Sequence, residues 1–305
     1  MPIHFSRRSR FERLSEAPVN PTVADQRLTV IMTCHNRAAL TERCVLQVLS
    51  EADDFSGSVR VVVLDDGSTD DTRERLEGLR GVTVAKGDGS YFWARGMSTA
   101  EQIALAQSPP PTHLLWLNDD VDLAPGSILK ALSVSRKQPE SVLVGATVSP
   151  ILASDITYSG LVNTGPHPLR FSKAALGSKR LDAFNGNFVM VPTSVIERVG
   201  GVDGRYSHAL ADIDYGVRVK RAGVPVILLD EPIGSCAANE VTFGSTREEW
   251  RKFVGPKGGG NLKSLTRILR LITPHTWPFW LIATYAQWVR RAILRKIARS
   301  KLVRR

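Results

Sequence analysis

The sequence predicts an α/β fold with a mostly parallel sheet flanked by helices. Short apolar runs rich in β-branched residues alternate with segments of helical periodicity along most of the chain. This alternation is typical of βαβ units, whose strands are buried on both faces and therefore appear as continuous apolar runs. Ligands bind at the carboxyl ends of the strands in such sheets. The polar residues that follow the runs are therefore the candidates for a functional site.

The strands, the helices and the domain boundaries follow from this pattern. Six apolar runs are predicted to be strands: 28–33, 59–64, 113–117, 141–148, 188–191 and 224–229. Five segments between them are predicted to be helices: 38–49, 70–79, 95–106, 127–136 and 212–222. We expect a poorly structured lead-in over residues 1–27, an α/β domain over 28–254, and a basic helical extension over 255–305, which starts at a glycine-rich hinge.

Composition indicates an ordinary globular protein, because 43% of the 305 residues are hydrophobic and 23% are charged. The three cysteines, Cys34, Cys44 and Cys236, have no spacing typical of disulfide or zinc sites. No apolar segment of a secretory signal follows the arginines near the N-terminus. We therefore expect a cytoplasmic protein.

The basic charge lies in the C-terminal segment. Residues 257–305 contain twelve Lys and Arg and no acidic residue, while the net charge of the whole chain is +10. Five aromatic residues accompany these charges: Trp277, Phe279, Trp280, Tyr285 and Trp288. Prolines interrupt the apolar run, so it does not fit a transmembrane span, and the mixture is typical of a membrane interface. We expect a peripheral protein on the anionic inner face of the cell membrane. A helical pair packed on the α/β domain is the alternative, and no nucleic-acid-binding module is recognisable.

Two predicted strands run into polar sequences that suit a nucleotide. The first is followed by Thr33-Cys34-His35-Asn36-Arg37, where the backbone N–H groups at the start of the next helix can bind an anion. The alternative is a helix cap by Asn36 alone. The second strand ends at Asp65-Asp66-Gly67, and capping requires only one carboxylate. The second carboxylate at this place favours a role as a hydrogen-bond acceptor for the base or the ribose of a nucleotide.

A third acidic sequence follows the buried strand at 113–117. Asp119, Asp120 and Asp122 lie within four residues, and such carboxylates repel one another unless a cation or hydrogen-bond donors balance them. Clusters of carboxylate oxygens suit Mg²⁺ or Mn²⁺, whereas the spacing of an EF-hand loop is missing. A solvated acidic turn before Pro125 is the alternative.

Together these motifs identify a resemblance to a known family. The runs V-I-M-T-C-H-N-R (30–37), V-V-V-L-D-D-G-S-T-D-D-T (61–72) and W-L-N-D-D-V-D-L-A-P (116–125) resemble the family 2 glycosyltransferases, which have the Rossmann-like GT-A fold. Segments 185–192, 199–203 and 211–218 resemble the acceptor-side signature of that family. Segment 87–97 is similar to a bacterial subset that transfers sugars onto cell-envelope glycans. The match spans about residues 28–240 in the family's order.

The resemblance implies an inverting enzyme that moves a sugar from a nucleotide diphosphate, with UDP or dTDP favoured, to a hydroxyl of a glycan or lipid-linked acceptor. It implies Mg²⁺ or Mn²⁺ as the cofactor. The implied nucleotide-sugar ligands are Thr33, His35 and Asp66 at the base, Asp119 at the ribose, and Arg37 and Arg95, of which Arg95 reaches the diphosphate. Asp120, assisted by Asp122, would hold the metal, and Asp212 would be the general base. A plain helix cap is the alternative for Asp212, and an exposed arginine at the start of a helix is the alternative for Arg95. We expect the nearby His208 to be a surface residue, with a contact to the acceptor as the alternative.

Three positions depart from the family pattern. Ala211 replaces an acidic residue before the base, Asn118 replaces the first Asp of the metal motif, and Cys236 stands where some relatives have a metal-binding histidine. These departures motivate an alternative function, that of a catalytically inactive scaffold at the membrane. A sugar nucleotidylyltransferase is a further alternative, although its glycine-rich phosphate loop is missing. A dehydrogenase is disfavoured because the chain has no G-x-G-x-x-G motif after the first strand.

Overall fold

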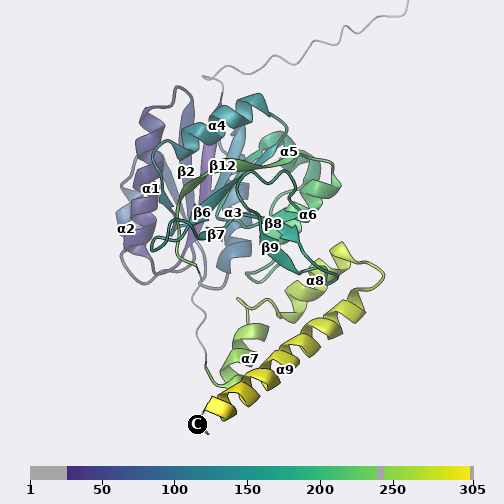
Figure 1. The fold of residues 1–305 in the computed structure, drawn as a ribbon. Coiled ribbons are helices and arrows are strands. Elements are labelled where there is room, and N and C mark those ends of the chain that lie inside the picture. The colour runs from purple at the N-terminus through teal and green to yellow at the C-terminus, as the bar shows by residue number, and fades with distance from the viewer. Residues whose placement is uncertain (1–25, 239–243, 303–305) are drawn as a thin grey trace, which may run out of the picture.

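A nine-stranded sheet forms the centre of the structure, a computed structural model that describes residues 26–238 and 244–302 (Figure 1). Its main path has the order β3-β2-β1-β4-β11-β6-β12-β5, and β7 pairs with β6. The strands are β1 (Arg27–Cys34), β2 (Ser58–Asp65), β3 (Val82–Lys86), β4 (His113–Leu117), β5 (Asp122–Leu123), β6 (Val142–Val148), β7 (Ile156–Tyr158), β11 (Phe188–Pro192) and β12 (Val226–Ser235). The first four strands of the path pair in parallel, and β11 runs antiparallel to both neighbours. The predicted α/β fold is confirmed.

Helices cover both faces of the sheet because successive residues of each buried strand point to opposite sides. Val62 and Leu64 of β2 pack with α3 (Phe92–Leu105) and α6 (Ala211–Arg221) in one core. Val61 and Val63 pack with α1 (Ala38–Asp53), α2 (Thr72–Glu77) and α4 (Ser127–Lys137) in the other. The strands carry apolar residues on both faces, which is why they appear in the sequence as continuous apolar runs and could be predicted.

The elements that the sequence pattern did not reveal are short or only partly buried. The edge strand β3 is one of them, since its five residues include no fully buried side chain. A small antiparallel sheet with the order β10-β8-β9 is another, built from β8 (Gly160–Asn163), β9 (Phe171–Lys173) and β10 (Ala183–Phe184). Helix α5 (Thr193–Val199) has only seven residues. Segments of this length carry too few residues to establish a period.

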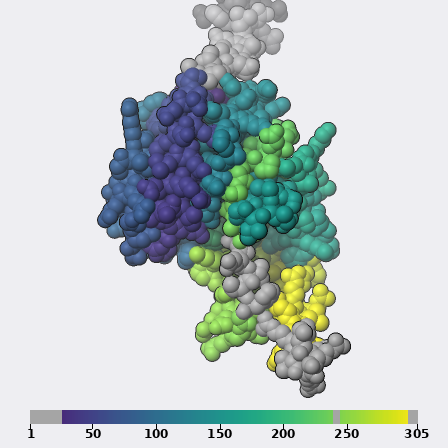
Figure 2. Space-filling model, turned by 60° about the vertical axis from the view of Figure 1, so that its left-hand side comes forward, coloured from purple at the N-terminus to yellow at the C-terminus, as the bar shows by residue number. Residues whose placement is uncertain are grey.

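Three C-terminal helices form a lobe that projects beyond the α/β domain (Figure 2): α7 (Thr246–Val254), α8 (Leu262–Ile272) and α9 (Trp277–Leu302). Leu265, Ile268 and Leu269 of α8 are fully buried in the core that also contains α3 and α6. The rings of Trp250 and Phe253 in α7 pack against α9 rather than against the sheet. The helical lobe therefore begins with α7, ahead of the boundary expected at residue 255. In the described part of the chain, no helix has both the length and the apolarity needed to cross a bilayer.

A buried carboxyl group couples α3 to the loop before α6. Glu101 Oε1 accepts a hydrogen bond from the backbone N–H of Val202 at 2.9 Å, and Glu101 Oε2 has no hydrogen-bond partner among the described residues. A side chain at Gly201 would collide with Glu101 Oε1, which explains the glycine at that position. Burial raises the pKa of Glu101 to about 7, against the opposing effect of the Val202 N–H. The folded protein therefore holds this carboxyl group in its neutral form at mildly acidic pH.

We expect the substitution Glu101→Gln to flatten the pH dependence of stability. Between the ordinary pKa of a glutamate and about 7, the folded state binds a proton that the unfolded state has lost, so the free energy of unfolding falls as the pH rises. For a shift of this size the wild type should lose about 3 kcal/mol across that window. Urea unfolding of both proteins at about pH 5 and about pH 8 measures the difference. Equal pH slopes in the two proteins would contradict a neutral buried Glu101.

Candidate functional site

A cavity of about 530 Å³ opens at the carboxyl ends of β1, β2 and β4. These strands are parallel neighbours, so the loops that follow them meet at one edge of the sheet. Seven of the nine predicted site residues line the cavity: Thr33, His35, Arg37, Asp66, Asp119, Asp120 and Asp212. The structure does not bring Arg95 and Asp122 to it.

Arg37 balances the acidic residues at the end of β4. Its Nη1 lies 3.0 Å from Asp119 Oδ1 and 2.9 Å from Asp120 Oδ2. Asp119 is buried, and burial together with the charge of Asp120 raises its pKa to about 6 against the opposing effect of Arg37. The hydroxyl of Thr41, one turn into α1, lies 3.4 Å from Asp119 Oδ2. The repulsion expected between these carboxylates is therefore relieved by an arginine from the loop after β1.

Asp66 holds the start of α3 in place. Its Oδ1 accepts hydrogen bonds from the backbone N–H groups of Gly89 (2.9 Å) and Tyr91 (3.2 Å), and its Oδ2 accepts one from Phe92 (2.8 Å). Asp66, which is predicted to contact a nucleotide base, therefore also contributes to the fold. The three donors leave some acceptor capacity on the carboxylate, which still lines the cavity.

Backbone strain is concentrated at the same place. In the described residues, positive φ angles outside glycine occur at three positions, Asn36 (52°), Phe92 (51°) and Leu210 (79°). Phe92 and Leu210 line the cavity, and Asn36 lies between the lining residues His35 and Arg37. Each such residue costs about 1–3 kcal/mol and persists only where its surroundings hold it. Strain of this kind clusters at binding and catalytic sites.

Asp212 enters the cavity from the first turn of α6. Its Oδ2 accepts a hydrogen bond from the N–H of Gly186 at 3.2 Å, and its Oδ1 accepts one from Ile213 at 2.8 Å. Burial raises its pKa, while these N–H groups lower it. The residue that caps α6 is Leu210, so Asp212 is not a plain helix cap. A half-buried carboxylate held by backbone donors can accept a proton from a bound hydroxyl group.

The two remaining predicted residues point elsewhere. The Asp122 side chain is exposed in β5, accepts a hydrogen bond from Gln47 Nε2 at 2.7 Å and lies 3.7 Å from Arg43 Nε. The Arg95 guanidinium lies over the ring of Tyr91, 3.7 Å from its centroid, and 3.9 Å from Asp88 Oδ2. Asp122 lies in β5, which pairs with β12, and its side chain contacts α1, whereas Arg95 lines a different cavity.

Three further residues that line the cavity are not among the predicted site residues. Trp93 donates from Nε1 to Asn118 Oδ1 at 2.9 Å and packs over Gly186. His208, expected at the surface, is instead half-buried in the cavity wall. Burial and the charges of Lys257 and Arg37 lower its pKa to about 4, which keeps the ring neutral. Lys257 comes from the loop between α7 and α8, and only its place as the one cation of a glycine-rich stretch distinguishes it in the sequence.

The side chains of the cavity fit a divalent cation only when a bound nucleotide supplies further oxygen ligands to it. Among the residues that the structure describes, no three His, Cys, Asp or Glu side chains form a metal-binding group. Asp120 Oδ2 is paired with Arg37, and Asp120 Oδ1 lies 3.5 Å from the Cys236 thiol. Burial and the charge of Asp120 raise the pKa of that thiol to about 12, so it donates a hydrogen bond rather than binding as a thiolate. Mg²⁺ and Mn²⁺ tolerate so few protein ligands when phosphate oxygens and water complete the shell.

We expect Asp66→Ala to destabilise the protein by about 2–3 kcal/mol, because it leaves three partly buried backbone N–H groups without their acceptor. Asp65→Ala is the matched control, since Asp65 is equally buried but accepts from a single N–H, that of Ser68. Urea unfolding measures both losses. An Asp66→Ala protein as stable as the wild type would show that Asp66 does not hold the start of α3.

Comparison with known proteins gives a family and a fold. The family model described as "Glycosyl transferase family 2" matches residues 29–199. A search of functionally curated proteins finds no significant match.

Three solved structures resemble the chain at low identity. A mannosyltransferase from Pyrobaculum calidifontis, solved with GDP-Man and Mn²⁺, has 18% identity and a TM-score of 0.50, with 89% of this chain and 72% of that chain covered. GalNAc-T7, solved with UDP, GalNAc and Mn²⁺, has 14% identity and a TM-score of 0.59, with 83% and 49% covered. TarS from S. aureus has 15% identity and a TM-score of 0.54, with 81% and 39% covered. These likenesses show the GT-A fold alone. With the family model matching more than half of its length, the chain belongs to glycosyl transferase family 2.

Proposed function

We propose that the protein is an inverting glycosyltransferase that moves a sugar from a nucleotide diphosphate to a hydroxyl group of a cell-envelope or lipid-linked glycan. The observation that carries this proposal is a single cavity that holds both the Arg37–Asp119–Asp120 cluster and the carboxylate of Asp212. The cluster belongs to the end of β4 and Asp212 to the start of α6. Binding of a charged leaving group and removal of a proton can therefore take place in one space.

On the donor side, we assign Thr33, His35 and Asp66 to the base and Asp119 to the ribose. The ring Nδ1 of His35 lies 2.8 Å from the backbone oxygen of Asp66, which ties the loops after β1 and β2 together. We expect UDP or dTDP, which the resemblance to the family favours. Asp120 would hold Mg²⁺ or Mn²⁺, which neutralises charge on the diphosphate when bound. Arg37 and Lys257 add two cations from different loops of the cavity wall.

On the acceptor side, Asp212 would take the proton of the attacking hydroxyl group. The Trp93 ring links this carboxylate to the donor side, because it is bonded to Asn118 and packs over Gly186, whose N–H binds Asp212. An indole ring between the two sides gives a sugar a flat apolar surface on which to stack. Inversion follows if the hydroxyl attacks from the face opposite the diphosphate.

Nucleotide titration with and without Mn²⁺ tests the donor side. We expect one of UDP, dTDP, GDP and CMP to bind more tightly with the metal, and Asp120→Ala to remove that gain. Asp122→Ala should bind as the wild type does, because its carboxylate lies outside the cavity. Asp212→Asn should also bind normally, while its transfer rate falls by about 10²–10⁴-fold, as for loss of a general base.

Two results would contradict this assignment. If none of the nucleotides shows metal-dependent binding, the inactive scaffold becomes the better description. If Asp212→Asn transfers sugar at the wild-type rate, the general base lies elsewhere.

We propose further that the protein acts at the anionic inner face of the cell membrane, with α9 as the contact. One face of α9 carries exposed apolar side chains three or four residues apart: Phe279, Ile282, Ala286, Val289, Ile293 and Ile297. The exposed Arg290 and Lys296 lie at the two edges of this stripe. The opposite face, with Tyr285 and Trp288, packs on α7. A helix with an exposed apolar stripe and basic residues at its edges is suited to lie in a membrane interface. Its apolar side chains are buried there among the lipid chains, and its basic side chains contact anionic headgroups.

Sedimentation with lipid vesicles tests the membrane contact. Ile282→Glu should weaken binding to vesicles with anionic lipid by about tenfold. The substitution removes an apolar side chain that would be buried in the membrane, and it adds a negative charge that the anionic lipids repel. Gln287→Glu is the matched control, since it adds the same charge at an exposed position outside the stripe. Equal binding of Ile282→Glu and the wild type would exclude this face of α9 as the contact.

A further inference from the structure

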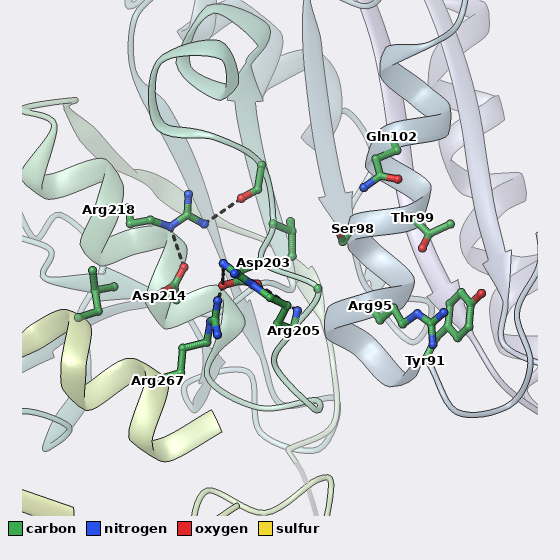
Figure 3. Close-up of a pocket in the computed structure, with 14 residues that line it drawn as sticks. Tyr91, Arg95, Ser98, Thr99, Gln102, Asp203, Arg205, Asp214, Arg218 and Arg267 are labelled. Atoms are coloured by element: carbon green, nitrogen blue, oxygen red, sulfur yellow. Dashed lines mark hydrogen bonds and ion pairs between the residues drawn. The ribbon is translucent and has the colours of Figure 1, made fainter. Parts of the chain in front are cut away.

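A second cavity, of about 840 Å³, is lined by α3 and by the loop before α6 (Figure 3). Along one wall, α3 presents Arg95 stacked on Tyr91, followed by Ser98, Thr99 and Gln102. The other wall is the segment 201–205, with Arg267 of α8 beside it. The two walls are close, since a side chain at Gly204 would come within 3.0 Å of Ser98 Cβ.

A third cavity, of about 970 Å³, continues the second toward the C-terminal helices. The two share the lining residues Tyr91, Arg95, Gly204 and Arg205. Its further wall is largely apolar and aromatic, with Trp250, Val254, Pro256, Leu262 and Tyr285. We call the two cavities together the basic groove.

Positive charge exceeds negative charge in the lining of the basic groove. The lining contains five basic side chains, Arg95, Arg205, Arg218, Arg267 and Lys263, and two acidic ones, Asp203 and Asp214. Arg218 and Asp214 form a closed pair at 2.7 Å. Arg205 and Arg267 share the single carboxylate of Asp203, at 2.8 and 2.6 Å. Two arginines share one carboxylate, and among the described residues Arg95 on the facing wall has only the distant Asp88 carboxylate at 3.9 Å, so the groove has an excess of guanidinium donors.

The basic groove adjoins the cavity that contains Asp212. Phe92 lines both, and the chain neighbours Pro256 and Lys257 line one each. Ser207 lines the groove and His208 lines the cavity. A molecule whose hydroxyl group reaches Asp212 can therefore extend past Phe92 into the groove.

We propose that the basic groove binds the phosphate or diphosphate group of a lipid-linked acceptor. This inference rests on the proposed function, whose acceptor it specifies. Arginine binds phosphate oxygens through paired N–H groups, and the excess of arginines in the groove suits such a group. The apolar wall from α7, α8 and α9 suits the first part of the lipid chain and leads toward the proposed membrane contact. Arg95 is thereby assigned to the acceptor phosphate rather than to the diphosphate of the donor.

The test is a titration with farnesyl diphosphate in the presence of EDTA. The EDTA prevents metal-dependent binding in the donor cavity, which is the first cavity, lined by Asp120 and Asp212. The wild type and Asp120→Ala should bind this probe equally. The double variant Arg95→Gln/Arg205→Gln should bind it at least about tenfold more weakly. Thr99→Glu, which adds a negative charge without removing any ion pair, should weaken it as well. Arg73→Gln is the matched control, because Arg73 is similarly exposed and pairs with Glu77 on α2, away from the groove.

Each other outcome overturns the proposal. If the double variant and Thr99→Glu both bind the probe as tightly as the wild type, the groove is excluded as its site. If Asp120→Ala binds the probe more weakly than the wild type, the probe occupies the cavity that contains Asp120 and Asp212. Farnesol binding as tightly as the diphosphate would show that charge is not recognised. Inorganic diphosphate binding as tightly as the probe would exclude the lipid. Weaker binding of the donor nucleotide by Arg95→Gln would return Arg95 to the donor side. Because the titration needs no donor nucleotide, its result is independent of whether transfer is observed.

Discussion

Charge balance at the end of β4 is the constraint on which the rest of the site depends. Asp119 is buried beside Asp120, and two such carboxylates cannot both ionise in a partly apolar site without a cation close by. Arg37 supplies that cation within 3.0 Å of each. Since Arg37 follows β1, the ion pairs join the ends of two neighbouring strands. Burial and the charge of Lys257 lower the pKa of His208 on the cavity wall, and the same arginine adds to that effect.

This balance gives a physical account of two departures from the family pattern. An aspartate at position 118 would add a third carboxylate beside Asp119 and Asp120, which already share Arg37. The neutral Asn118 instead accepts a hydrogen bond from Trp93, which shapes the cavity. Cys236 remains a protonated thiol and donates toward Asp120. Both substitutions are therefore compatible with a working site that binds its metal mainly through the ligand, and neither requires the scaffold alternative.

The sequence predicted what depends on local pattern and missed what depends on tertiary contacts. The buried strands were readable because both of their faces are apolar, and the polar residues after them had to meet at one edge of the sheet. The direction in which a loop side chain points could not be predicted from the sequence. Asp122 turns away because β5 pairs with β12, and Arg95 turns away because it stacks on Tyr91. Lys257 reaches the cavity from more than a hundred residues further along the chain than the acidic motif, so no spacing could reveal it.

The loop between α7 and α8 connects the site to the helical lobe. Lys257 of this loop lines the donor cavity, while its neighbour Pro256 lines the basic groove. The loop is held at both ends, because Tyr285 of α9 donates to the backbone oxygen of Gly260 at 2.8 Å and the Ser207 hydroxyl donates to that of Pro256 at 2.8 Å. A glycine-rich stretch that looks like a hinge in the sequence is therefore a fixed wall shared by two cavities. The face of α9 that packs inward positions this wall, and the opposite face is the membrane contact proposed above.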